Sequence, residues 1–416
     1  MPKVSVILTS FNHDKYIHEA IESVLNQTFT DFELIIWDDS SSDESWTLIN
    51  QYSDVRLKAV RNDVNEGPVF GINKAISDIA TGDYIAIHHS DDVWELSKLE
   101  KQVDFLDANQ EIGGVFTWAK IIDEQGETQE NNYFSQTNKT RWEWLQKLFT
   151  GENRLNHPSL LIRKQCYQDV GLYRYSLAQT PDAEMWSRVL LKFPIHIIKE
   201  KLTKHRLFTD NSNTSGIRID VKIRISNEWN ILRENFLALT DFNDIVAIFP
   251  SLERYRNPAG FDNKFLLAMA CLYECKQKNA WQLGLTWLFE LVNDPVCYQK
   301  ITELYAFYYA DLIKLTAEFD VYGIESVSAA ELQAEVEHLR TSNTWLESQR
   351  ASWENAATER EQQNTSQRAA WENVAIERDA VIHMLYTSHS WKVTRPLRFM
   401  ARLIREPMLL FTLFRK

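Results

Sequence analysis

The first 110 residues alternate short apolar runs with amphipathic segments. Runs such as VSVILTS, FELIIWD and DYIAIHH are rich in β-branched and aromatic residues and predict strands. The segments between them, such as HDKYIHEAIESVLNQT, repeat apolar residues at helical spacing and predict helices. Strands that alternate with helices indicate an α/β fold with a largely parallel sheet. In such a sheet, ligands bind beyond the carboxyl ends of the strands.

Polar loops follow three of the predicted strands. They are residues 9–12 (TSFN), residues 38–40 (DDS) and residues 90–92 (SDD). Because the carboxyl ends of parallel strands lie at one edge of a sheet, we expect the three loops to lie close together. Chance could place one such loop after a strand, but three of them are better explained by a ligand site.

The stretch IAIHHSDDVW raises the question of why Asp91 and Asp92 stand side by side after a strand. Adjacent carboxylates repel each other unless solvent or a cation takes up the charge. One interpretation is a solvated strand end, in which Asp92 caps the following helix. The other is a site where the carboxylates hold Mg²⁺ or Mn²⁺ against a phosphate-bearing substrate. These residues alone leave both interpretations open.

The pattern is mixed from Gly114 onwards and helical from about residue 217 to about residue 320. In the mixed part, DAEMWSRVLLKF predicts a short amphipathic helix, and PIHIIKEKLTKHRLF is rich in strand formers. The helical part contains many aromatic residues, which we expect to pack between helices rather than to bind a ligand. We therefore expect a helical domain at residues 216–325.

Residues 326–388 carry apolar residues at the a and d positions of a heptad repeat, with polar interruptions. Within this stretch QRASWENAATERE recurs as QRAAWENVAIERD, so that Trp353 and Trp371 are separated by about five helical turns and share a face. The pattern predicts a coiled coil and, through it, a homo-oligomer. The alternative is a solitary charged helix without a partner.

Residues 389–416 mix arginine with leucine, phenylalanine, methionine and isoleucine, whereas the whole chain has a formal charge of −13. A basic amphipathic segment of this kind favours an anionic membrane surface. The alternative is a helix that docks on the acidic body of the protein itself. The negative charge of the whole chain argues against nucleic acid as a partner.

Other features indicate a cytoplasmic protein. No apolar run approaches the roughly 18 residues of a membrane span, and the first residues enter a strand pattern without a signal peptide. The four cysteines show neither the spacing of metal ligands nor a disulfide framework, which favours a reducing compartment. Together with the basic tail, these features predict peripheral attachment at the inner face of the plasma membrane.

The stretch VSVILTSFN…QTFTDFELIIWDDSSSDES…GDYIAIHHSDDVW resembles the family 2 glycosyltransferases, which are inverting, nucleotide-sugar-dependent enzymes of the GT-A fold. The resemblance covers roughly residues 1–215. It implies a glycosyltransferase domain there, with a nucleotide-binding half at residues 1–110 and an acceptor half at residues 111–215.

The resemblance also implies which residues bind the donor. Thr9 and Phe11 would line the nucleotide pocket, and Asp39 would accept a hydrogen bond from an N–H group of the base. The D-x-D-type metal motif aligns on residues 89–92, with Asp92 as the direct ligand and Asp91 as a second metal residue that also lies beside the donor. His89 stands where the commoner motif has its first carboxylate. A neutral imidazole can bind Mn²⁺ but suits Mg²⁺ poorly, which leaves the role of His89 open.

The segment TPDAEMWSRVLL resembles the family signature E-D-x-x-x-W-x-R near the acceptor site, although a proline replaces its glutamate. The resemblance implies that Asp182 is the catalytic base, with Glu184 as the next candidate and Trp186 beside the acceptor. NHPSLLIRK resembles the strand that lines the acceptor side, where His157 would face the sugar. A later R-x-H element of the family has Phe208 in place of its histidine.

The implied activity is the inverting transfer of a sugar from a nucleotide-diphosphate donor to a glycan acceptor, with a divalent cation, Mn²⁺ or Mg²⁺, as cofactor. Residues 390–398 (SWKVTRPLR) resemble the tails of bacterial surface-polysaccharide glycosyltransferases, which implies a lipid-linked acceptor. The alternative is a degenerate glycosyltransferase domain that acts as a coiled-coil scaffold. A dinucleotide-dependent oxidoreductase is disfavoured because LTSFNH stands where such an enzyme has G-x-G-x-x-G.

Overall fold

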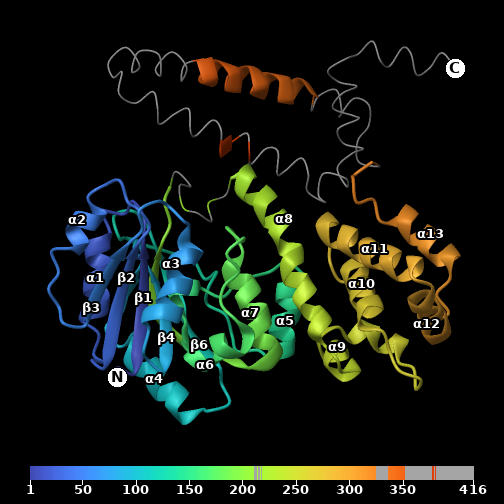
Figure 1. Ribbon diagram of the computed structural model, residues 1–416, viewed down its shortest axis with the longest axis horizontal. Coiled ribbons are helices and arrows are strands. Elements are labelled where there is room, and N and C mark those ends of the chain that lie inside the picture. The colour runs from blue at the N-terminus through green and yellow to red at the C-terminus, as the bar shows by residue number, and fades with distance from the viewer. Residues whose placement is uncertain are drawn as a thin grey trace. The chain divides into compact units, whose positions relative to one another are not determined.

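The computed structural model describes residues 1–209, 213, 216, 218–324, 336–351, 377, 378 and 380 (Figure 1). The chain forms two compact units, residues 1–324 and residues 325–416, and each is described by itself.

A nine-stranded sheet lies at the centre of the first unit, with the strand order β3-β2-β1-β4-β8-β6-β9-β5 and with β7 paired to β6. The strands are β1 (Val4–Ser10), β2 (Phe32–Asp38), β3 (Leu57–Arg61), β4 (Tyr84–His89), β5 (Val93–Trp94), β6 (Gly114–Ile122), β7 (Thr128–Gln129), β8 (Leu161–Arg163) and β9 (Ile195–Arg206).

Most of the sheet is parallel, as the sequence pattern predicts. Strands β3, β2, β1 and β4 run in one direction, and β6 and β9 run parallel to each other. Strand β8 is antiparallel to both β4 and β6, and β5 is antiparallel to β9. The carboxyl ends of β1, β2, β4, β6 and β9 therefore lie at the same edge of the sheet.

Successive residues of the central strands face opposite sides of the sheet, and each side has its own core. On one side, Val4, Val6 and Leu8 of β1 pack with α1, α2 and α4, whereas Ile7 faces the other core. The helices of the first side are α1 (Ile17–Leu25), α2 (Ser45–Ile49) and α4 (Lys98–Ala108). Those of the other side are α3 (Pro68–Lys74) with the π-helical segment η1 (Ala75–Ile79), α5 (Arg141–Phe149), α6 (Lys164–Val170) and α7 (Pro181–Lys192).

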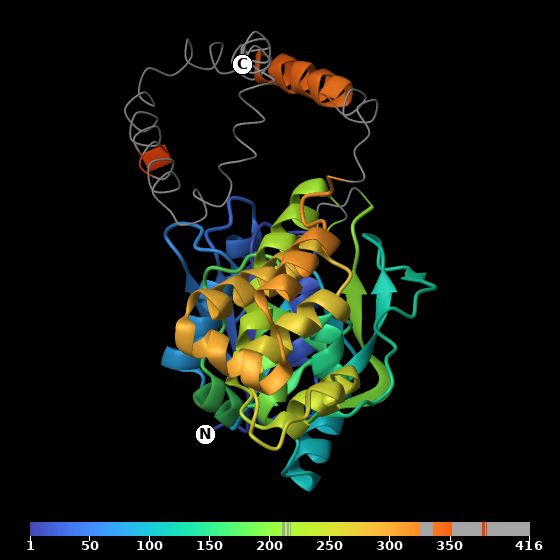
Figure 2. The same ribbon diagram turned by 90° about the vertical axis from the view of Figure 1, so that its right-hand side faces the viewer.

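The predicted helical region is confirmed. It contains α8 (Ile219–Glu234), η3 (Asn235–Ala238), α9 (Phe242–Ile248), η4 (Pro250–Tyr255), α10 (Asn263–Tyr273), α11 (Lys278–Asn293), α12 (Pro295–Tyr305) and α13 (Tyr309–Glu318) (Figures 1 and 2). Its buried residues, Trp229 and Trp287 among them, share one core with the face of the sheet that α5 and α7 cover. These aromatic side chains pack between helices, as expected.

In the second unit, residues 336–351 form a helix on which Leu339 and Leu346 are more than half exposed. Most of the predicted coiled coil (326–388) and all of the basic tail (389–416) lie outside the described residues. Among the described residues, none of the helices has the length and apolar character that crossing a membrane requires.

The shared core gives a prediction about stability. Phe149 at the end of α5 is fully buried, and its ring centroid lies 4.9 Å from that of Phe236 and 4.7 Å from that of Phe249. Phe149→Ala should lower the free energy of unfolding by about 3–5 kcal/mol, because it leaves a cavity between the sheet and the helical region. The exposed Phe289 provides the control, for which truncation to alanine should cost less than about 1 kcal/mol. Urea unfolding followed by tryptophan fluorescence measures both, and equal effects would contradict a shared core.

Candidate active site

The three polar loops lie side by side at the carboxyl edge of the sheet. The backbone N–H of Ser90 donates to the carbonyl of Thr9 over 3.2 Å, and that of Asp39 donates to the carbonyl of Ser10 over 2.8 Å. Asn12 and Ser40, one in each of two loops, have positive φ angles of 53° and 64°. Such backbone is uncommon outside glycine and is often found at functional sites.

Asp39 is buried and fixed by the loop that follows β3. One carboxylate oxygen accepts hydrogen bonds from Asn62 Nδ2 (2.7 Å) and from the backbone N–H of Glu66 (2.8 Å). The other accepts from the backbone N–H of Gly67 (2.8 Å). Since a carboxylate oxygen has two lone pairs, the second oxygen can accept one further N–H group. Nearby in the chain, Phe11 is 44% exposed and Thr9 is partly buried.

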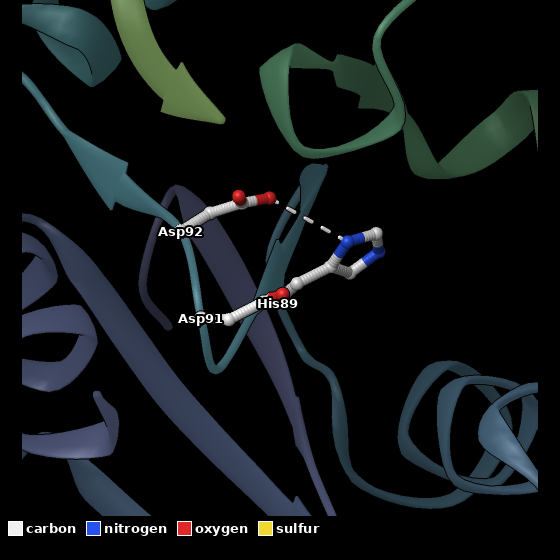
Figure 3. Close-up of side chains that lie close together, drawn as sticks. All are labelled: His89, Asp91 and Asp92. Atoms are coloured by element: carbon white, nitrogen blue, oxygen red, sulfur yellow. Dashed lines mark ion pairs between the residues drawn. The ribbon is translucent and has the colours of Figure 1, made fainter. Parts of the chain in front are cut away.

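His89, Asp91 and Asp92 form one cluster after β4. One ligand atom from each residue lies within 4.8 Å of the other two. Figure 3 shows the Asp92 carboxylate pointing toward the His89 ring, and the ion-pair distance from His89 Nδ1 to Asp92 Oδ2 is 3.6 Å. Two carboxylates and one imidazole are a donor set that suits Mn²⁺ better than Mg²⁺, which prefers oxygen ligands.

Asp92 is held as an anion by residues from the end of β9. Its carboxylate accepts from His205 Nδ1 (3.1 Å) and from the backbone N–H of Arg206 (2.9 Å). Burial alone would raise the pKa of Asp92, but His205, His89 and the Arg206 N–H outweigh it and lower the pKa to about 2. The same pairing raises the pKa of His205 above its usual value despite burial.

Asp91 has the opposite environment. Burial, followed by the negative charge of Asp92, raises the pKa of the Asp91 carboxyl. A divalent cation between the two side chains would remove this repulsion, since a nearby positive charge favours the ionised form of a carboxyl. The residues present therefore fit a bound cation.

Asp182 lies near the N-terminus of α7. It accepts hydrogen bonds from Asn153 Nδ2 (2.9 Å) and from the backbone N–H of Ala183 (2.7 Å). These bonds lower the pKa of its carboxyl, but withdrawal from water outweighs them and raises the pKa to about 6. A carboxyl with such a pKa can both bind and release a proton near neutral pH.

Glu184, two residues after Asp182 on α7, is fully buried and is bound by two arginines and an asparagine. Its carboxylate pairs with Arg174 Nε at 2.7 Å and with Arg188 Nε and Nη2 at 2.7 Å each. It also accepts from Asn235 Nδ2 (3.0 Å). A carboxylate so paired fixes α7 against its surroundings, whereas Asp182 has no cationic partner among its hydrogen bonds.

His157 packs between His89 of the aspartate cluster and Trp186 of α7. The ring centroid of His157 lies 5.2 Å from that of His89 and 5.6 Å from that of Trp186. His157 Nε2 lies 2.9 Å from the hydroxyl of Tyr173, and burial lowers the pKa of His157 so that its ring is neutral. Trp186 is buried, and its Nε1 has no hydrogen-bond partner among the described residues.

The structure adds His13 and Asn153, to which the sequence gave no role, and shows what Arg206, the arginine of the R-x-H element, contacts. His13 Nδ1 lies 2.8 Å from Ser90 Oγ, and Asn153 holds Asp182. Arg206 is almost fully buried, donates to the carbonyl of Asp91 and pairs with Glu19. His13 directly follows the TSFN loop, so its place after a predicted strand could have indicated a site residue. No motif or strand end marks Asn153 in the sequence. Phe208, which replaces the family histidine, packs on Tyr16 with ring centroids 5.4 Å apart.

Comparison with known families identifies the first part of the chain. The model of the family described as Glycosyl transferase family 2 matches residues 5–164. An uncharacterized glycosyltransferase of Methanocaldococcus jannaschii is 31% identical over 222 residues, which cover 52% of this chain and 75% of that protein.

A second relative has a specified activity. The UDP-Glc:alpha-D-GlcNAc-diphosphoundecaprenol beta-1,3-glucosyltransferase WfaP of Escherichia coli is 37% identical over 110 residues. This similarity covers 26% of this chain and 43% of WfaP, less than half the length of that relative.

Two solved structures are also similar, with lower sequence identity than these relatives. The S. aureus TarS fragment 1-349 in complex with UDP-GlcNAc is 19% identical, with a TM-score of 0.49, over 69% of this chain and 80% of that one. The mannosyltransferase PcManGT from Pyrobaculum calidifontis, in complex with GDP-Man and Mn²⁺, is 15% identical, with a TM-score of 0.43, over 76% of this chain and 86% of that one.

The raised pKa of Asp182 makes stability depend on pH in a testable way. A carboxyl with a folded pKa of about 6 and an ordinary unfolded pKa binds its proton more tightly in the folded state. The contribution of Asp182 to the stability of the wild type therefore falls as pH rises through this interval. Asp182→Asn does not titrate, so its melting temperature relative to the wild type should rise between pH 4 and pH 7, as measured by differential scanning fluorimetry. A difference that is constant with pH would contradict the raised pKa.

Proposed function

Because the chain belongs to glycosyltransferase family 2, we propose that it is an inverting, metal-dependent enzyme that transfers a sugar from a nucleotide-diphosphate donor to a glycan acceptor. The observation that carries the proposal is the placement of two carboxylate groups of opposite character. Asp92 is held ionised at the carboxyl edge of the sheet, and Asp182 is held ready to take up a proton. The His157 ring packs against His89, which pairs with Asp92, and against Trp186 of α7, the helix that carries Asp182.

Asp39 and the β1 loop would bind the nucleoside. The remaining lone pair of Asp39 can accept the N–H group of a uracil or thymine ring, and its other contacts keep the carboxylate in place. Phe11 exposes an aromatic surface at the end of the neighbouring strand, where Thr9 adds a hydroxyl group.

Asp92, Asp91 and His89 would hold the cation, for which the donor set favours Mn²⁺. The bound cation would supply positive charge to the diphosphate as it leaves. The protein itself contributes to this side of the reaction through His205 and the backbone of Arg206, which keep Asp92 ionised.

Asp182 would be the general base. Its carboxylate accepts the proton of the acceptor hydroxyl, and the oxygen then attacks the anomeric carbon opposite the leaving diphosphate. An attack in line with the leaving group inverts the configuration of that carbon without a covalent intermediate. Asn153 and the Ala183 N–H orient the carboxylate and leave lone pairs for the proton.

The acceptor in the proposal is a lipid-linked glycan in surface-polysaccharide biosynthesis. The E. coli relative, whose name specifies a diphosphoundecaprenol-linked sugar, supports this class of acceptor. The sequence of the tail, residues 389–416, favours peripheral attachment to an anionic membrane surface, where such an acceptor is held. Residues 326–388 would join copies of the chain, and the exposure of Leu339 and Leu346 on the described helix is compatible with a seam of that kind.

The metal site gives a prediction about activity. Asp92→Asn keeps the size of the side chain but removes its charge, so the rate of nucleotide-diphosphate release should fall at least about a hundredfold, or about 2.7 kcal/mol of barrier. The donor is chosen by a thermal-shift screen of UDP, GDP and dTDP sugars with Mn²⁺, in which a bound ligand raises the melting temperature. Asp104→Asn, at an exposed position of α4, is the control and should keep wild-type activity. A folded Asp92→Asn protein with more than about a tenth of wild-type activity would contradict the assignment of Asp92 to a metal site.

The base gives a separate prediction. Asp182→Asn preserves the shape of the side chain but cannot accept a proton, so donor affinity should survive while turnover falls by roughly 10² or more. Isothermal titration of Asp182→Asn and of the wild type with the nucleotide diphosphate of the selected donor and Mn²⁺ measures affinity for the nucleotide part of the donor, and release of nucleotide from the selected donor measures turnover. Unchanged turnover would remove Asp182 from the mechanism.

A further inference from the structure

Helix α8 lies beyond the segment that the family model matches, yet it contacts the surroundings of Asp182 from two directions. We propose that Glu228 of α8 is a positioning residue for the transfer reaction, which holds Asp182 in place through the backbone of residues 178–180. This inference rests on the proposed function, in which Asp182 is the base.

The Glu228 carboxylate binds the loop that leads into α7. One oxygen accepts the backbone N–H of Ala178 (3.0 Å). The other accepts the backbone N–H groups of Gln179 (2.8 Å) and Thr180 (2.9 Å), together with the hydroxyl of Thr180 (3.1 Å). Glu228 is 7% exposed, so water competes little for these bonds. Asp182 follows two residues after Thr180, and its direction depends on how this loop enters the helix.

Only a carboxylate satisfies this arrangement. The four groups that face Glu228 are all donors, and an ionised carboxylate accepts through both oxygens. A glutamine in either orientation would place its NH₂ group against at least one N–H group, which leaves buried donors without a partner. Such unmade hydrogen bonds are costly, and the loop would move to relieve them.

The same helix also binds the end of α5, shortly before Asn153 in the chain. Trp229 Nε1 donates to the carbonyl of Leu148 (2.8 Å), and Arg233 Nε donates to the carbonyl of Phe149 (2.9 Å). These carbonyls end α5, and the chain continues from there to Asn153, whose amide donates to Asp182. Helix α8 therefore binds the chain segments that lead to both Asn153 and Asp182.

A third contact fixes the next turn of α7. Asn235, directly after α8, donates to Glu184 (3.0 Å) and to the hydroxyl of Ser187 (2.9 Å). Figure 1 shows α8 running beside α7 and α5. A misplacement of the base by about 1 Å is enough to lower a rate about a hundredfold, because proton transfer needs hydrogen-bond distance. The position of Asp182 is thus set by a helix of another part of the chain.

The first experiment compares Glu228→Gln with the wild type in the full-length protein. We expect the affinity for the selected nucleotide diphosphate with Mn²⁺ to stay within about twofold, because the donor residues lie on other loops. We expect turnover of the selected donor to fall at least about tenfold, measured below the melting temperature of every variant. Glu234→Gln, at an exposed position on the last turn of the same helix, is the matched control and should behave like the wild type.

The second experiment asks whether Glu228 acts through Asp182. In the Asp182→Asn background there is no base left to position, so adding Glu228→Gln should change turnover by less than about twofold. Equal losses in both backgrounds would show a general effect on the fold and overturn the proposal. Should Glu228→Gln fail to fold, Thr180→Val removes one of the four hydrogen bonds, and a loss of about threefold that disappears in the Asp182→Asn background is expected.

The outcomes separate this inference from the proposed function. If Asp182→Asn leaves turnover unchanged, the base assignment fails regardless of Glu228. If Asp182→Asn lowers turnover while Glu228→Gln, or Thr180→Val in its place, matches the wild type, the base stands and the positioning role of Glu228 is refuted.

Discussion

The Asp92 carboxylate links the loop after β4 to the end of β9. It follows β4 of the parallel part and is bound by His205 and Arg206 at the end of β9, more than a hundred residues later. A buried anion is stable only when its lone pairs are satisfied and an opposite charge lies near it. The His205 ring and the Arg206 N–H meet both needs, and the side chain of Arg206 binds the Asp91 carbonyl as well. The turn that carries both aspartates is therefore fixed by β9.

The surroundings of Asp92 and Asp182 shift the pKa values of the two carboxyl groups in opposite directions. Donors and imidazoles surround Asp92 and keep its pKa at about 2, whereas Asp182 has one amide and one backbone N–H, and its pKa is about 6. Groups whose environments separate their pKa values in this way can divide the roles of charge binding and proton transfer. The His157 ring, which burial keeps neutral, lies close to His89 of the aspartate cluster and to Trp186 of α7, the helix that carries Asp182.

The sequence predicted those parts of the molecule that depend on local pattern. The strands β1, β2 and β4, the helix α7 and the all-helical region each follow from the spacing of apolar residues, and the meeting of three polar loops follows from the parallel sheet. Contacts between segments that are far apart in the sequence leave no regular spacing of residues from which they could be predicted. The pairing of His205 with Asp92 and that of Asn153 with Asp182 became visible only in three dimensions. Glu184 illustrates the same limit. Of its two arginine partners, Arg188 lies on α7 itself, at helical spacing, whereas Arg174 precedes the helix and has no such spacing to indicate the contact.

The contacts of α8 extend the structural unit around Asp182 into the helical region. The match to the family model ends at residue 164, before Asp182, and the sequence suggests a boundary near residue 215. The hydrophobic core crosses that boundary without interruption, and Glu228 and Asn235 hold α7 from beyond it. A sheet edge can arrange the proposed donor side by itself, because the strand ends lie next to one another. The proposed acceptor side consists of a loop and a helix end, which have few backbone partners of their own, so their geometry has to be fixed by the helical region packed against them.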